Sequence, residues 1–146
     1  MQYNQYKFKF YLNASHAIYI KGILGEKHPH TWEIEISTVK QKGIFVKFEE
    51  VEDLIEPFLE QYQNKFLNEE EPFLSMNPTL ENITGFLLKG IQKILHPLGW
   101  MVFTIEVSET PARSFIISLV ENNVISDLQQ QNLTNDIIQN SFPKDI

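Results

Sequence analysis

Residues 28–36 read His-Pro-His-Thr-Trp-Glu-Ile-Glu-Ile, and this stretch decides the fold class and the first candidate site. From Trp32 onward apolar and polar residues alternate, which predicts a strand with one buried face, running to about Val39. Residues two apart in an extended chain point to the same face, so His28 and His30 can both reach one ion. The sequence therefore predicts a pair of metal ligands at the start of a core strand.

A second alternating run precedes this stretch and ends near another histidine. Tyr6, Phe8, Phe10 and Leu12 share one face of a predicted strand over residues 5–12, and His16 follows it. If the two strands are neighbours, His16 joins His28 and His30. Three neutral imidazoles with an open fourth position are typical of a catalytic zinc site. The alternative is that His28 and His30 are surface loop residues and His16 is a strand histidine with ordinary partners.

Composition bounds the class of protein. The 146 residues are 42% hydrophobic and 21% charged, which suits one globular domain with its own core. The net charge is −7 and Arg113 is the only arginine, so we expect no nucleic-acid partner. The sequence has no cysteine, no secretory signal and no apolar run long enough to cross a bilayer. We therefore expect a cytoplasmic protein without a membrane partner.

The middle of the chain predicts a short strand and then a helix. Residues 40–43 favour a turn, and residues 44–48 alternate again, which predicts a strand returning to the sheet. Residues 51–62 carry apolar side chains at helical spacing. Pro57 lies inside this pattern and predicts either a kink or a late start of the helix.

A second helix is predicted after Asn77-Pro78, with Asn77 as its cap and Pro78 in its first turn. Gly85 and Gly90 lie within it and would permit close packing on a neighbour. Residues 97–99 end this helix, and two further strands are predicted at 101–108 and 114–120. The buried stripe of the helix is predicted to be Leu80, Ile83, Leu87, Ile91, Ile94 and Leu95.

The order of elements predicts an α+β fold in which an antiparallel sheet carries both helices on one face. We expect this domain to span residues 1–121. Residues 122–146 are rich in Asn and Gln, and we expect either a loosely docked helix or a disordered tail there.

Six stretches are informative when they are taken together and in order: Phe10 to His16, His28-Pro29-His30, Gly43 to Phe48, Phe66-Leu67-Asn68, Asn77-Pro78-Thr79-Leu80-Glu81-Asn82 and Glu109-Thr110-Pro111. Over roughly residues 6–118 they resemble the 6-pyruvoyl-tetrahydropterin synthases and their relatives, the 6-carboxy-tetrahydropterin synthases of queuosine biosynthesis. The resemblance implies the T-fold, a four-stranded antiparallel sheet with two helices on one face. It also implies self-association, commonly as a hexamer of two stacked trimers, in which the sheets join into a barrel.

The resemblance further implies the residues of a site. The family holds zinc on three histidines, which carries over to His16, His28 and His30. A glutamate of the late Glu-Thr motif anchors the pterin ring, which carries over to Glu109; a carboxylate can accept two parallel N–H bonds from an aminopyrimidinone edge. Thr79 and Glu81 match a motif near the pterin pocket, although helix capping and first-turn charge explain them equally well.

The chain departs from the family at the residues that transfer protons. The family's cysteine is absent, and Gln63 and Asn64 stand at the positions of its Asp-His pair. Neither amide can serve as a general acid or base. Glu26, two residues before His28, is the candidate base, and a solvated turn residue is the alternative. Two further departures are Lys47, where the family has an acidic residue, and Pro29, where it has glycine between the two histidines.

A triphosphate-bearing substrate needs cations, and the candidates are Lys21, Lys27 and Arg113. Solvated surface charge is the alternative for the lysines. Arg113 stands four residues after Glu109, so an ion pair between the two is the alternative for the arginine.

Two functions stay open on the sequence alone. The first is a zinc-dependent carbon–oxygen lyase acting on a pterin such as 7,8-dihydroneopterin triphosphate, with zinc as the Lewis acid. The second is a catalytically degenerate T-fold protein that binds zinc and a pterin or purine-like ligand without turnover. A third possibility, an unrelated zinc hydrolase, has no supporting motif such as His-Glu-x-x-His.

Overall fold

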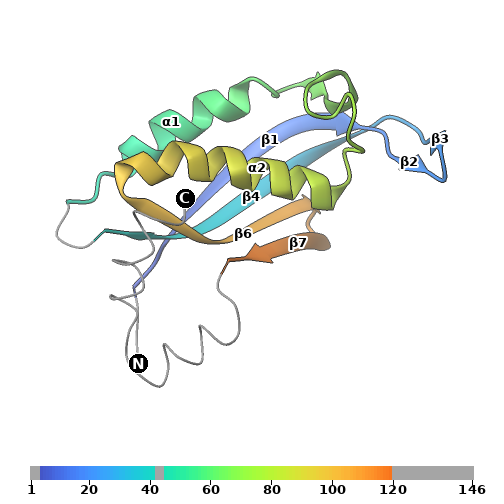
Figure 1. Cartoon of the computed structure of the whole chain (residues 1–146). Coiled ribbons are helices and arrows are strands. Elements are labelled where there is room, and N and C mark those ends of the chain that lie inside the picture. The colour runs from blue at the N-terminus through green and yellow to red at the C-terminus, as the bar shows by residue number, and fades with distance from the viewer. Residues whose placement is uncertain (1–3, 42–44, 120–146) are drawn as a thin grey trace.

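Two helices lie across one face of a five-stranded sheet in the computed structural model, which describes residues 4–41 and 45–119 (Figure 1). The sheet has the order β5-β1-β4-β6-β7, and every pairing is antiparallel except that of the short edge strand β5 with β1. Its strands are β1 (Tyr6–His16), β4 (His28–Lys40), β5 (Lys65–Phe66), β6 (Trp100–Thr110) and β7 (Arg113–Ser118). The α+β fold with four antiparallel strands and two helices on one face is therefore confirmed, and β5 is an addition to it.

The remaining elements cover or flank this sheet. The helices are α1 (Phe48–Glu60) and α2 (Leu80–Leu95), with short 3-10 turns at Leu67–Glu69 and His96–Leu98. Helix α2 is continuous through Gly85 and Gly90. A small hairpin of β2 (Tyr19–Ile20) and β3 (Ile23–Leu24) connects β1 to β4. Its turn residues Lys21 and Gly22 have positive φ angles of 52° and 79°, as the tightest hairpin turns require.

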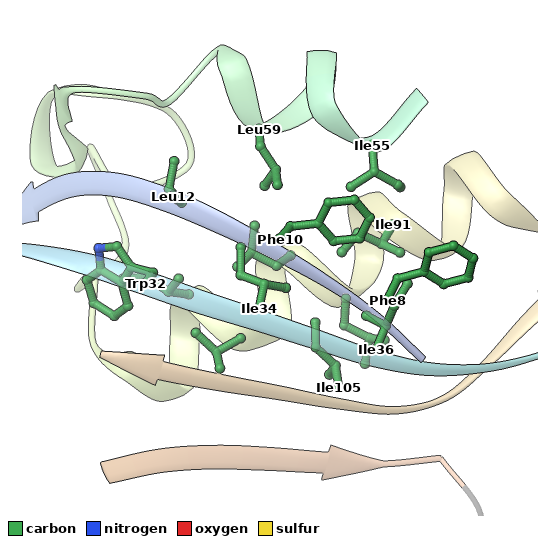
Figure 2. Packing of buried hydrophobic residues seen from close by; sticks show 14 of the residues in the cluster. Phe8, Phe10, Leu12, Trp32, Ile34, Ile36, Ile55, Leu59, Ile91 and Ile105 are labelled. Atoms are coloured by element: carbon green, nitrogen blue, oxygen red, sulfur yellow. The ribbon is translucent and has the colours of Figure 1, made fainter. Parts of the chain in front are cut away.

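The core lies between the helices and the sheet. Alternate residues of β1 and β4 turn toward the helices, so each strand contributes a row of buried apolar side chains (Figure 2). The helices supply the opposite layer at helical spacing, which buries most of the predicted stripe of α2. The residues at the centre of this contact are Phe8, Phe10, Leu12, Trp32, Ile34, Ile36, Ile55, Leu59, Ile91 and Ile105.

The predicted strand at residues 44–48 is wrong for the part that the structure describes. Residues 45–47 belong to no strand, and α1 already begins at Phe48, with Glu49 and Glu50 in its first turn. Both edges of β4 are occupied, by β1 on one side and β6 on the other, so a returning strand has no place beside it. Acidic residues also favour a helix N-terminus, because they complement its dipole. The late helix start is wrong as well, since α1 runs through Pro57.

Helix α2 spans Leu80–Leu95, and its predicted cap is wrong by two residues. Thr79 is the N-cap, and its hydroxyl accepts a hydrogen bond from the backbone N–H of Asn82 at 3.1 Å. Pro78 therefore precedes the helix instead of lying in its first turn. Asn77 is unavailable as a cap because its side chain binds Tyr19, on the β2–β3 hairpin.

The two glycines of α2 differ in their surroundings. A Cβ atom at Gly90 would overlap the Phe58 ring of α1, lying 2.9 and 3.0 Å from Cε1 and Cε2, whereas nothing lies within 4 Å of one at Gly85. The predicted close packing is thus confirmed for Gly90 alone. The boundary expected at residue 121 and the expected form of residues 122–146 lie outside the described residues. Within residues 4–41 and 45–119, no helix is long and apolar enough to cross a membrane.

Candidate metal centre

The pairing of β1 with β4 brings three histidines together. His16 is directly opposite His28, and Ala14 is opposite His30, so the two-residue period of β4 places both of its histidines beside the end of β1. One ligand atom from each of the three lies within 4.8 Å of the others. The ring centroids are 4.4 Å apart for His16 and His28, 5.1 Å for His16 and His30, and 4.8 Å for His28 and His30. His28 and His30 are thus strand residues, and the alternative of a surface loop is wrong.

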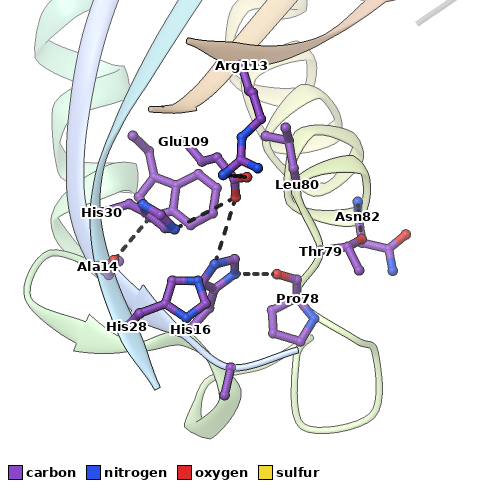
Figure 3. A network of polar contacts seen from close by, with 12 residues as sticks. Ala14, His16, His28, His30, Pro78, Thr79, Leu80, Asn82, Glu109 and Arg113 are labelled. Carbon is purple, nitrogen blue, oxygen red and sulfur yellow. Dashed lines mark hydrogen bonds and ion pairs between the residues drawn. The ribbon is translucent and has the colours of Figure 1, made fainter. Parts of the chain in front are cut away.

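Backbone carbonyls fix the ring tautomers of two of these histidines. His16 Nδ1 lies 2.8 Å from the carbonyl oxygen of Pro78 (Figure 3). His28 Nδ1 lies 2.9 Å from the carbonyl oxygen of Glu26. A carbonyl oxygen only accepts, so each Nδ1 carries the hydrogen and donates it. In the neutral ring the lone pair is then left on Nε2, which is the arrangement that metal-binding histidines use.

Burial favours the neutral rings of His16 and His30 and leaves one nitrogen of each without a partner. Desolvation lowers the pKa of His16, against the opposing effect of its hydrogen bond to Pro78, and desolvation also lowers the pKa of His30. His16 Nε2 and His30 Nε2 are buried and have no hydrogen-bond partner. Buried polar atoms without partners are rare and costly, and a cation between them would satisfy both. The residues present therefore fit a metal ion.

A carboxylate and an arginine lie beside the histidines. Glu109 Oε2, from the end of β6, is 3.9 Å from His16 Nε2 and 3.8 Å from His30 Nε2 (Figure 3). Arg113 Nη2, from the start of β7, is 3.3 Å from Glu109 Oε1. The Glu109–Arg113 ion pair considered from the sequence is therefore present.

A tryptophan that the sequence did not single out forms an apolar wall of the site. The Trp32 ring is fully buried and meets the rings of His16 and His30 edge to face, at centroid distances of 4.8 and 5.1 Å. Its indole N–H donates to the carbonyl oxygen of Ala14 at 3.1 Å, which fixes the ring. The sequence could have indicated this role, because Trp32 follows His30 by two residues and strand alternation therefore puts both side chains on the same face.

Three side-chain amides hold the backbone around His16, and we call them the carboxamide clamps: Gln63, Asn68 and Asn77. Each accepts a backbone N–H and donates to a backbone carbonyl, as a neighbouring strand would. Gln63 binds the N–H of Asn13 and the carbonyl of Tyr11, both at 2.8 Å.

The other two clamps act after His16. Asn68 binds the N–H and the carbonyl of Ala17 at 2.9 and 2.8 Å, and Asn77 binds both groups of Tyr19 at 2.9 Å. The motif resemblance included Asn68 and Asn77, but nothing in the sequence pattern indicated which backbone groups they bind.

The other predicted site residues have these positions. Thr79 caps α2, which was one of the two interpretations of that residue, and Glu81 is exposed in the first turn of the same helix. Glu26 is exposed before β4 and touches the site through its carbonyl oxygen. Lys27 Nζ lies 4.7 Å from the centre of the Phe66 ring, and Lys21 is at the tip of the β2–β3 hairpin. Within the described part of the chain, the structure gives no side-chain contact between these five residues and the three histidines.

One hollow borders His30 and Glu109, although neither His16 nor His28 lines it. Its volume is about 410 Å³, which is within the range of small-molecule sites. The lining includes His30 and Glu109 together with Tyr11, Pro29 and Thr110. A second hollow, of about 380 Å³, also borders His30 and is lined in part by Asn13, Ser15 and Lys65.

Comparisons with known proteins identify a family and agree with the fold. The family model described as 6-pyruvoyl tetrahydropterin synthase matches residues 5–120. Among solved structures, the 6-pyruvoyl tetrahydropterin synthase of Caenorhabditis elegans is similar at 12% identity and a TM-score of 0.65, covering 79% of this chain and 94% of that one. An uncharacterized protein of Wolinella succinogenes is similar at 16% identity and a TM-score of 0.63, covering 80% and 98%.

A third similar structure is a variant of the Plasmodium vivax enzyme in which a catalytic glutamate is replaced by alanine. It matches at 14% identity and a TM-score of 0.58, covering 78% of this chain and 97% of that one. Comparison with curated protein sequences gives no match. At these identities the structural matches establish the fold, and the match to the family model covers most of the chain.

Proposed function

The chain belongs to the 6-pyruvoyl tetrahydropterin synthase family, and from this premise we propose that it is a zinc-dependent carbon–oxygen lyase acting on a pterin. The proposed zinc ligands are His16, His28 and His30, and the proposed substrate is a compound such as 7,8-dihydroneopterin triphosphate. The observation that supports this best is the convergence of three imidazoles, two of them fixed by carbonyls with Nε2 free to bind a metal.

Zinc, when bound, would supply a Lewis acid that polarises oxygens of the pterin side chain. The chain's own residues do the rest of the positioning. Glu109 would accept N–H bonds from the aminopyrimidinone edge, as a carboxylate can accept two in parallel. Arg113 Nη2, 3.3 Å from Glu109 Oε1, would orient that carboxylate. Trp32 closes one side of the site and limits the access of water.

Glu26 is the proposed base, which would take the carbon-bound proton of the side chain as the leaving group departs. Its backbone carbonyl already holds His28, so the residue is anchored next to the histidines. The described solved structures include a Plasmodium vivax 6-pyruvoyltetrahydropterin synthase whose catalytic residue is a glutamate. A carboxylate therefore serves as a catalytic residue in one protein of this fold, which supports the same assignment in a chain without cysteine.

Binding without turnover is the second candidate, and one observation favours it. Gln63 and Asn64 occupy the positions of the family's Asp-His pair, and the structure uses both to hold β1. Gln63 clamps Tyr11 and Asn13, while the backbone N–H of Asn64 donates to the carbonyl of Asn13. These positions hold the strand in place and offer no group that transfers a proton.

We also propose that the protein self-associates, as a hexamer of two trimers. Two features of the sheet within the described residues support this: an edge strand that can pair further, and a charged outer face. β7 is an edge strand with one neighbour, and the face opposite the helices carries ion pairs such as Lys9 Nζ with Glu33 Oε1 at 3.3 Å. An edge of this kind can pair with another subunit. Light scattering on a sizing column should give six chains, and a monomer would contradict the proposal.

The metal content of the purified protein and its turnover of dihydroneopterin triphosphate, measured on the same samples, test the function. We expect about one zinc per chain in the wild type and in the control His96→Ala, and much less in His28→Ala. Product formation that Glu26→Gln abolishes without loss of zinc supports the lyase. Zinc without any turnover supports the binding protein, and a wild type without zinc contradicts both.

A further inference from the structure

The Glu109 carboxylate faces one ring nitrogen of His16 and one of His30. Its Oε2 is 3.9 Å from His16 Nε2 and 3.8 Å from His30 Nε2, and both nitrogens are buried without a hydrogen-bond partner. His16 donates through Nδ1 to the carbonyl of Pro78, so its Nε2 presents a lone pair to the carboxylate. A lone pair and an anion at this separation repel each other unless a cation lies between them.

The distances are close to those that a shared metal ion requires. Ligand atoms about 2.0–2.1 Å from a tetrahedral zinc ion are separated by roughly 3.4 Å, from the geometry of the tetrahedron. Glu109 Oε2 is therefore within about half an ångström of a ligand position relative to two of the three histidines. The histidine nitrogens themselves, up to 4.8 Å apart, have to move farther to bind one ion.

Arg113 determines which carboxylate oxygen is available. Its Nη2 lies 3.3 Å from Oε1, which leaves Oε2 directed at the histidines. The Glu109 side chain is only 14% exposed, so water can solvate Oε2 only in part. A carboxylate oxygen in such a place needs a partner, and the ion pair supplies one for Oε1 alone.

We propose that Glu109 is the fourth ligand of the metal when no pterin is bound, and that a pterin displaces it. This inference rests on the proposed function. Three imidazoles and one carboxylate form a closed tetrahedral set, and the carboxylate reduces the charge of a divalent centre. The aminopyrimidinone edge would compete for the same carboxylate. Ligand binding would then draw Glu109 away and open the fourth position to the ligand's own oxygens.

The test uses Co(II) alone as the probe, on the full chain. Glu109→Gln should bind Co(II) at least about tenfold more weakly than the wild type and give a different visible spectrum, because water or an amide replaces the carboxylate. Arg113→Gln keeps the carboxylate and should weaken binding less. Glu106→Gln is the matched control, on the same strand but on the other face of the sheet, where its carboxylate accepts from Ser114.

The outcomes separate the two proposals. Equal Co(II) affinity and spectrum for Glu109→Gln and the wild type overturn the fourth ligand and leave the three-histidine site intact. A wild type that takes up no Co(II) overturns the inference and the proposed function together. Saturating neopterin, with its binding followed by fluorescence, should change the Co(II) spectrum of the wild type. An unchanged spectrum at saturation overturns the displacement.

Discussion

Replacing Asn77 by alanine should weaken metal binding more than the loss of stability alone explains. The side chain binds the N–H and the carbonyl of Tyr19, and the next residue, Pro78, accepts the hydrogen bond that fixes the His16 tautomer. Two hydrogen bonds of this kind contribute roughly 1–3 kcal/mol together. Loss of a group that orients a metal-binding histidine typically weakens metal binding by about 10–100-fold.

Gln63→Ala is the matched control. It also removes two hydrogen bonds, but from the backbone of Tyr11 and Asn13, which precede His16 in β1 and do not contact Pro78 through this side chain. We expect a similar loss of stability, again roughly 1–3 kcal/mol, with metal affinity changed by no more than about threefold. The comparison therefore separates holding the fold from positioning His16.

Two assays are needed for each variant. Urea unfolding of the metal-free protein gives the free energy of unfolding, and competition with a chelator at fixed pH gives the metal affinity. The reasoning is refuted if Asn77→Ala and Gln63→Ala weaken metal binding equally. In that case the clamps would only stabilise the fold, and the loop at Pro78 would not need Asn77 to hold His16.

Three further predictions concern packing, capping and the metal. Gly85→Ala should stabilise the protein by about 0.5–1 kcal/mol through helix propensity. The Gly90→Ala variant should be about 1–3 kcal/mol less stable than the Gly85→Ala variant, because its methyl group meets the Phe58 ring. Equal shifts in melting temperature for the two variants would contradict the close packing. Thr79→Ala should cost about 1 kcal/mol, measured by urea unfolding, because it removes the cap on the N–H of Asn82; an unchanged midpoint would mean that the cap contributes nothing. Removing the metal with a chelator should lower the melting temperature of the wild type, since a ligand present at 100 times its Kd contributes about 2.7 kcal/mol; the same melting temperature with and without chelator would contradict a metal-bound native state.

The sheet could be predicted because its signal is local. Alternation in residues 5–12 and 32–39 is a property of each strand, and His28 and His30 share a face for the same reason. The strand expected at residues 44–48 failed because alternation over five residues carries no information about its neighbours. Both edges of β4 are taken, and only the whole topology shows this.

The parts of the site that are side chains could be predicted from the sequence, and the parts that are backbone groups could not. The three histidines and Glu109 were identified from motifs, and the structure brings them together. The carbonyls of Pro78 and Glu26 that fix the ring tautomers have no residue-type signature, because every residue has a carbonyl. Asn77 was misassigned as a cap for a related reason: Asn suits a helix N-terminus, but a contact 58 residues away determines its role.

Gln63 stands where the family has a proton-transferring acid, and it binds the backbone of β1 instead. Its amide both donates to Tyr11 and accepts from Asn13, whereas an ionised aspartate or glutamate could only accept. Restoring an acid at this position would therefore place a carboxylate against the Tyr11 carbonyl and weaken the edge of β1. Proton transfer from this position and the hold on β1 at Tyr11 and Asn13 therefore compete for the same side chain. A chain that keeps an amide here must take its base from elsewhere, for which Glu26 is the proposed residue, or it must work by binding alone.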